Sequence, residues 1–133
     1  MDRLQDLSAP IGRLFLSLIF VISGVGKITG YAGTQAGMES AGVPGVLLPL
    51  VIILEVLGGL AIIVGFKARP IAVLLAGFSV LSAIIFHNFL ADPSQMNSFM
   101  KNIAMAGGFL LIFAHGAGAY ALDNRYIVRE PAY

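Results

Sequence analysis

The sequence is poor in charged residues. Only 11% of its 133 residues are Asp, Glu, Lys or Arg, whereas 58% are hydrophobic. A soluble domain carries about a quarter of its residues as charged side chains, so this composition predicts a membrane protein. The net charge of +1 and the absence of a basic stripe argue against nucleic acid as a partner.

Two residue types are missing altogether. The chain has no cysteine, which excludes disulfides, thiol redox chemistry, iron–sulfur clusters and cysteine-rich zinc sites. It has no tryptophan, which leaves interfacial anchoring to Tyr, Lys and Arg. His87 and His115 are expected to lie about 20 Å apart along the membrane normal, too far to hold one haem. The sequence therefore indicates no metal site and no identifiable cofactor of this kind.

Long apolar runs dominate what is present. Residues 47–66 are all apolar or small except Glu55. About 20 helical residues cross the roughly 30 Å hydrocarbon core, so this run predicts a transmembrane helix. Three further spans are predicted at 11–28, 70–90 and 99–120. The purely apolar part of the last is too short to cross alone and must draw in its polar flanks.

The ends of the predicted helices carry recognisable signals. Ser8 is expected to cap a first helix that begins near Pro10. Residues 65–70 are too short for anything but a hairpin turn between antiparallel helices. Asp92 followed by Pro93 is a typical helix start.

The longest connection is the Gly- and Ala-rich stretch 29–46. Within it, Thr34 could cap a short helix that runs to Ala41 and stops at Gly42. This stretch is either a packed lid or a loose surface loop, and the sequence leaves both readings open. The tail from Asp123 is expected to be polar and exposed.

Basic residues predict the orientation. If the four spans run antiparallel, six of the basic residues fall at one end of the resulting bundle, whereas Lys27 and Lys101 fall at the other. The six are Arg3, Arg13, Lys67, Arg69, Arg125 and Arg129. Because cytoplasmic loops are enriched in Lys and Arg, the six are expected on the cytoplasmic side. The prediction is one membrane domain over residues 1–133: an all-α, antiparallel four-helix transmembrane bundle with both termini cytoplasmic.

Five polar residues are predicted to share one layer in the outer leaflet: Lys27, Glu55, His87, Lys101 and Asn102. A charge near the centre of a span costs about 2.5–3.5 kcal/mol, so Glu55 needs a partner or a polar cavity. If the helices bring the five together, they form a cationic pocket with a bridging acid. That pocket suits an anionic or carbonyl-bearing hydrophobic ligand.

A quinone headgroup fits this chemistry. Lys or His side chains can donate to its carbonyl oxygens, and Glu55 and His87 could pass protons. The structural alternative is that Lys27 and Lys101 extend to lipid headgroups while Glu55 forms an ion pair. Both readings stay open, and no catalytic residue is assigned.

Small residues are expected to let the helices approach closely. The candidates are Gly26, Gly58, Gly59, Gly107 and Gly108. The same small-residue faces could form the contacts of a homo-oligomer. Arg13 is expected to have a structural role in the layer of the inner leaflet.

Short motifs follow one another along the chain in a distinctive order. They are Gly12-Arg13, Ser23 to Lys27, Gly42-Val43-Pro44, Leu54-Glu55, Gly58 to Leu60, Gly65 to Arg69, His87, and Lys101-Asn102 leading into Gly107-Gly108. Together they resemble the DoxX family, from about Gly12 to Asp123. The loop from Lys27 to Thr34 is similar to the YqjF-like branch of small inner-membrane proteins.

The resemblance implies a multi-pass protein of the bacterial inner membrane. Some members of that family resemble the small subunit of thiosulfate:quinone oxidoreductase, and others are linked to redox complexes that protect against oxidative stress. We therefore expect a non-catalytic accessory subunit that meets a quinone or another small ligand. Its expected partners are the lipid bilayer and a membrane or periplasmic redox protein. The alternatives are a non-enzymatic assembly or scaffold protein and a small transporter component.

Overall fold

The computed structural model describes residues 3–124, and within them all regular structure is helical. The long helices are α1 (Arg3–Thr29), α3 (Leu48–Val64), α4 (Ala68–Phe86) and α5 (Met96–His115). The short elements are α2 (Tyr31–Ser40) and three 3₁₀ turns, η1 (Gly45–Leu47), η2 (Pro93–Gln95) and η3 (Leu122–Asn124). Counting η1 with α3 and η2 with α5, the described chain contains four helices long and apolar enough to cross a membrane. The predicted helical membrane bundle is confirmed.

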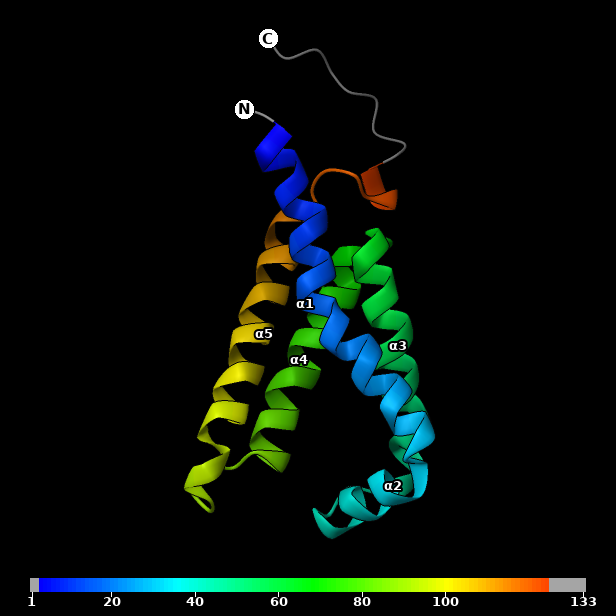
Figure 1. Ribbon diagram of the computed structural model, residues 1–133, viewed down its shortest axis with the longest axis vertical. Helices are drawn as coiled ribbons and strands as arrows, with labels where there is room; N and C mark the ends of the chain where they lie inside the picture. Colours follow the sequence, from blue (N-terminus) through cyan, green and yellow to red (C-terminus); the bar gives the residue numbers. More distant parts are fainter. Residues whose placement is uncertain (1–2, 125–133) are drawn as a thin grey trace.

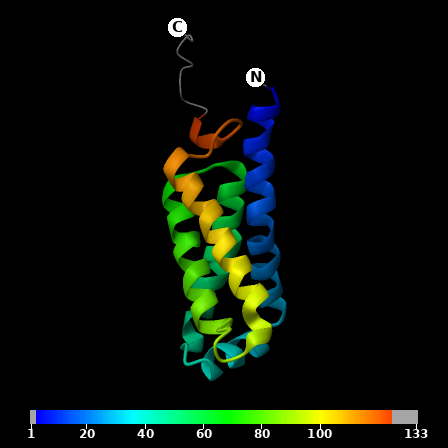
Figure 2. The same ribbon diagram turned by 90° about the vertical axis from the view of Figure 1, so that its left-hand side faces the viewer.

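The four long helices form two pairs. Helix α1 packs along α3, and α4 packs along α5. The pairs meet at the end where α3 turns into α4, and they diverge toward the end where α2 lies (Figure 1). We call these the hairpin end and the α2 end. Figure 2 shows the long helices running nearly side by side, with α2 across one end.

An aromatic cluster joins the two pairs. The Phe20 ring of α1 meets Phe109 of α5 at a centroid distance of 5.3 Å and Phe78 of α4 at 6.3 Å, both edge to face. Such aromatic pairs contribute about 0.5–1.5 kcal/mol each beyond their burial. Ile62 and Leu75 pack against the same core and are fully buried. The core therefore closes the space between the pairs on the hairpin side.

Glycine brings α1 and α3 into close contact. A Cβ added at Gly59 would lie 2.8 Å from a Val21 methyl and 3.3 Å from the Ser17 carbonyl oxygen. One added at Gly24 would lie 2.5 Å from a Val56 methyl. Each glycine thus allows the opposing helix to approach, which is the usual role of small residues in membrane helices.

The predicted glycine contacts are only partly right. Gly108 receives the Leu16 side chain, 3.1 Å from where a Cβ would stand, and Gly58 makes ordinary contact with α4. Gly26 and Gly107, by contrast, have open space around them in the described chain. Gly26 is wrong as an intrachain contact because two residues on a helix are a 200° rotation, which turns it away from the face of Gly24.

The first helix begins earlier than predicted. It starts at Arg3 and contains Pro10, and the Ser8 hydroxyl donates to the Leu4 carbonyl instead of capping a helix end. Pro10 removes one backbone donor, but the carbonyl it leaves free belongs to Asp6, which lies on the exposed polar end where water can serve it.

The connection after α1 is more helical than predicted. Helix α2 begins at Tyr31, so Thr34 lies inside it and donates its hydroxyl to the Gly30 carbonyl. Its end agrees with the prediction, because Gly42 adopts a left-handed φ of 85° just beyond it.

The third span is shorter than predicted, and the fourth begins and ends earlier than predicted. Helix α4 ends at Phe86 and not near residue 90, because the Asn88 side chain accepts hydrogen bonds from the next amides and makes a turn. Helix α5 ends at His115 and not at residue 120, because Gly116 takes a left-handed φ of 82°. Asp92 accepts a hydrogen bond from the Ser94 amide and caps η2, as predicted.

Arg13 fastens the segment after α5 to α1. Its guanidinium is buried and donates to the carbonyl oxygens of Ala117, Ala119 at 3.1 Å and Tyr120 at 2.8 Å. The segment that follows α5 is therefore held across the hairpin end and does not continue the helix.

Asp123 fastens the same segment to α4. Its carboxylate accepts hydrogen bonds from the amides of Lys67 and Ala68, the latter at 2.8 Å, while its own amide donates to the Gly65 carbonyl. Asp123 thus caps α4 from a distance; it is exposed, as predicted, but it is tied to the hairpin end by these hydrogen bonds. The remainder of that predicted tail, with Arg125 and Arg129, lies outside the described residues.

Candidate ligand cavity

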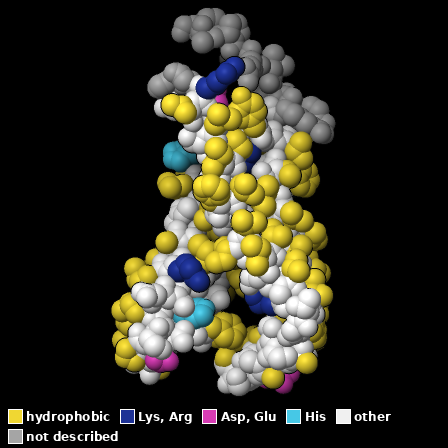
Figure 3. Space-filling model, in the orientation of Figure 1, with side chains coloured by type: hydrophobic (Ala, Val, Ile, Leu, Met, Phe, Trp, Pro, Cys, Tyr) yellow, Lys and Arg dark blue, Asp and Glu magenta, His cyan; other side chains and the backbone are white. Residues whose placement is uncertain are grey.

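A cavity of about 540 Å³ lies between the two helix pairs at the α2 end. Figure 3 shows the molecule hollowed there, between its two lower lobes. Pockets for small organic ligands in proteins span about 300–1,000 Å³. The space is therefore large enough for a molecule of that size.

All five residues of the predicted polar layer line this one cavity. Lys27 comes from α1 and Glu55 from α3, which form one wall. His87 follows the end of α4, and Lys101 and Asn102 come from α5, so these three form the opposite wall. The divergence of the pairs thus places two polar groups opposite three.

Lys27 and Glu55 form a buried ion pair. The Lys27 ammonium lies 2.7 Å from Glu55 Oε1 and donates a hydrogen bond of 2.7 Å to the Ser23 hydroxyl. The Glu55 side chain is 2% exposed and that of Lys27 26% exposed. The pair forms because Gly24 lets α1 approach α3 at this level, with the Glu55 Cβ only 3.2 Å from where a Gly24 side chain would begin.

The Glu55 carboxylate keeps acceptor capacity. Among the described residues its Oε1 makes the ionic contact with Lys27 and no further directed hydrogen bond. A carboxylate offers about four lone-pair sites. The carboxylate therefore keeps lone-pair sites that no hydrogen bond among the described residues uses, although Oε1 itself is buried.

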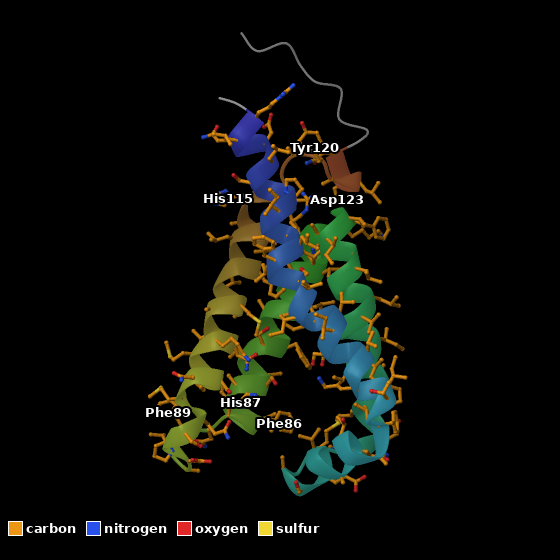
Figure 4. All side chains as sticks on the ribbon, viewed as in Figure 1. Phe86, His87, Phe89, His115, Tyr120 and Asp123 are labelled. Carbon is orange, nitrogen blue, oxygen red and sulfur yellow. The ribbon has the colours of Figure 1, made fainter. Side chains whose placement is uncertain are left out.

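His87 is oriented by the loop that follows it. Its Nδ1 lies 2.9 Å from the Gln95 side-chain oxygen, which can only accept, so Nδ1 carries the hydrogen. In the neutral ring Nε2 is then an acceptor. Figure 4 shows Phe86 and His87 together at the end of α4, beside the space between the pairs.

Asn102 and Lys101 complete the second wall. Asn102 is buried and donates from its side-chain nitrogen to the Ser98 carbonyl at 3.1 Å, which leaves its side-chain oxygen free to accept. Lys101 is exposed and has no carboxylate within ion-pair distance in residues 3–124. This wall therefore offers one uncompensated positive charge and two acceptors.

Sequence reasoning missed two lining residues, Ser23 and Ser82, which add hydroxyl groups. Thr34, Gly37 and Met38 of α2 also line the cavity, which agrees with the lid reading of the stretch 29–46 rather than with a loose loop. Ser23 could have been found, because it lies four residues before Lys27 and therefore on the same helix face. The other polar candidate, Arg13, does not line the cavity. It lies at the hairpin end, where its hydrogen bonds to the segment after α5 form what we call the clamp.

Four helices able to span a membrane, surrounding a cavity with a buried Lys–Glu pair, define a small multi-pass membrane protein with an intramembrane polar site. Residues 9–88 match the DoxX family. The chain belongs to that family.

The relatives agree with this assignment. The chain is 49% identical over 124 residues to the inner membrane protein YqjF of Escherichia coli (strain K12), covering 93% of this chain and 95% of YqjF. It is 37% identical over 123 residues to the inner membrane protein YphA of the same organism, covering 86% and 87%. The protein is thus YqjF-like and lies in the inner membrane as a multi-pass protein.

A more distant relative has a name that refers to chemistry. CatD of Bacillus subtilis (strain 168), whose name provisionally classes it as an oxidoreductase, is 27% identical over 85 residues, covering 64% of this chain and 63% of CatD. No solved structure matches the chain.

Proposed function

We propose that this protein binds a quinone, or a small molecule with the same carbonyl and hydroxyl chemistry, as an accessory subunit of a membrane redox complex. The observation that carries the proposal is the Lys27–Glu55 pair, buried in the wall of a cavity large enough for such a molecule. Ionisable groups inside a membrane protein usually mark a ligand or ion site. The provisional name of CatD points in the same direction.

The two walls suit both oxidation states of a quinone. An oxidised headgroup presents carbonyl oxygens on opposite sides of its ring, and Lys27 and Lys101 are donors on opposite walls. The reduced headgroup presents hydroxyl groups, and Glu55, His87 Nε2 and the Asn102 side-chain oxygen are acceptors. Oxidation of the reduced headgroup releases two electrons, taken by the partner redox protein, and two protons, for which the Glu55 carboxylate and His87 Nε2 are the candidate acceptors.

Binding to the purified protein tests this proposal. A short-chain quinone analogue is titrated against the wild type, Glu55→Gln and His87→Gln. We expect each variant to weaken binding about tenfold, equivalent to about 1.4 kcal/mol for a lost charged or directed contact. His115→Gln is the matched control, since His115 is exposed at the far end of α5. If both cavity variants bind like the wild type, the proposal is wrong; capture of a partner with no quinone binding would favour a scaffold protein instead.

We also propose that the hairpin end faces the cytoplasm. Four of the six basic residues behind the sequence-based orientation lie in the described chain at that end or toward it, namely Arg3, Arg13, Lys67 and Arg69. Because the chain has no cysteine, single cysteines report the side directly. In intact spheroplasts, an impermeant maleimide should label Ser40→Cys in α2, and should label Lys67→Cys only after permeabilisation. The reverse pattern would overturn this orientation.

A further inference from the structure

The cavity is closed at its hairpin end, and α2 lies across part of its other end. On the hairpin side, Phe20 and Phe78 of the aromatic cluster form its floor. At the α2 end, residues of α2 line it, and among them Met38 is buried. A ligand cannot enter through the floor, and α2 lies across the end of the bundle opposite it (Figure 2).

The cavity has a first side between α1 and α5. These helices touch where Leu16 packs on Gly108, and toward the α2 end they diverge (Figure 1). One turn beyond that contact, Ile19 lines the cavity and is 38% exposed, and Met105 of α5 also lines it. The rim of this side is therefore apolar and lies within the span of both helices.

A second side lies between α3 and α4. Here the helices touch where Leu75 and Ile71 pack at Gly58, near the hairpin end. Farther toward the α2 end, Val51 of α3 and Leu81 of α4 line the cavity, and Leu81 is 59% exposed. A residue that both lines the cavity and is exposed at membrane depth marks a place where the cavity meets the hydrocarbon.

We infer that the cavity is entered sideways from the membrane, and that its apolar sides hold the hydrocarbon chain of the ligand. This inference rests on the proposed function and names the ligand class: a membrane-borne amphiphile with a long isoprenoid or acyl chain. The polar groups gather on the facing inner walls, while the rims at Ile19 and Leu81 are apolar. An amphiphile would place its headgroup between the walls and leave its chain at a rim, in contact with lipid.

Blocking the sides tests the inference. Ile19→Trp narrows the α1–α5 side and Leu81→Trp narrows the α3–α4 side. Ile22→Trp is the control, because Ile22 is exposed on α1 and does not line the cavity. The protein is placed in nanodiscs, and association is measured for a long-chain isoprenoid quinone and for the chainless headgroup.

At least one of the two blocking variants should slow association of the long-chain quinone tenfold or more, while the chainless headgroup changes less than twofold. The Ile22→Trp control should change neither. The inference is overturned if both blocking variants leave the long-chain quinone unaffected, or if they slow both probes equally. Failure of both probes to bind the wild type would instead overturn the proposed function, and this inference with it.

Discussion

The buried ion pair predicts an unequal response to the loss of its two members. Lys27→Met leaves the Glu55 carboxylate, 2% exposed, without its cation. Breaking a buried pair from one side typically destabilises by about 3–5 kcal/mol, and because Lys27 is 26% exposed we expect the lower end, about 3 kcal/mol.

The opposite change should be milder. Glu55→Gln leaves a Lys27 ammonium that still donates to Ser23 and reaches the cavity. We expect a loss of about 1 kcal/mol, the scale of one hydrogen bond. In the double variant no unpaired carboxylate remains, so the expected loss is about 2 kcal/mol rather than the additive 4, a coupling of about 2 kcal/mol.

Reversible unfolding in mixed micelles, followed by helical circular dichroism, measures these free energies. Lys101→Met is the control, since an exposed lysine should change stability by less than about 0.5 kcal/mol. The reasoning is refuted if Glu55→Gln is as damaging as Lys27→Met, or if the two losses add in the double variant.

Three further predictions concern the frame around the cavity. Gly59→Ala should destabilise by about 1–3 kcal/mol because its Cβ would clash with α1, whereas Gly77→Ala, in open space on α4, should be neutral or stabilising; unfolding of the pair tests this. Asp123→Ala should cost about 1 kcal/mol and speed amide exchange at Ala68, and unchanged exchange would contradict the cap. Hydrogen bonds from the Ser94 hydroxyl and amide lower the pKa of Asp92. The stabilisation that Asp92 contributes is therefore fully present above the ordinary pKa of an aspartate and is lost as the pH falls through the lowered pKa. The protection of the Ser94 amide, relative to its intrinsic exchange rate at each pH, should therefore fall in acid in the wild type, and an equal pH profile in Asp92→Asn would contradict the assignment.

The spans and the polar layer could be predicted because they depend only on residue type and on the rise per residue of a helix. A carboxylate inside an apolar run demands a partner, and the rise per residue places Glu55 level with Lys27 on an antiparallel neighbour. The same arithmetic placed His87 and Lys101 at the same depth, and all four line the cavity.

The sequence could not predict how each helix is rotated about its own axis, or which residues far apart in the chain form hydrogen bonds. Choosing Gly24 rather than Gly26 as the contact requires knowledge of which face of α1 meets α3. An error of two residues along the helix selects nearly the opposite face. The hydrogen bond from His87 to Gln95 depends on how one loop folds, and the Asp123 cap joins residues 55 positions apart. Neither contact has a periodic signal.

The clamp at the hairpin end has a consequence for assembly. Arg13 belongs to α1, yet the carbonyl groups that receive its guanidinium lie 104 to 107 residues later. Until the ribosome has made those residues, this arginine has none of these partners, so α1 gains its last contacts only after residues 117–120 have been synthesised. The contacts that close the hairpin end therefore become available only after all four helices that wall the cavity have been synthesised.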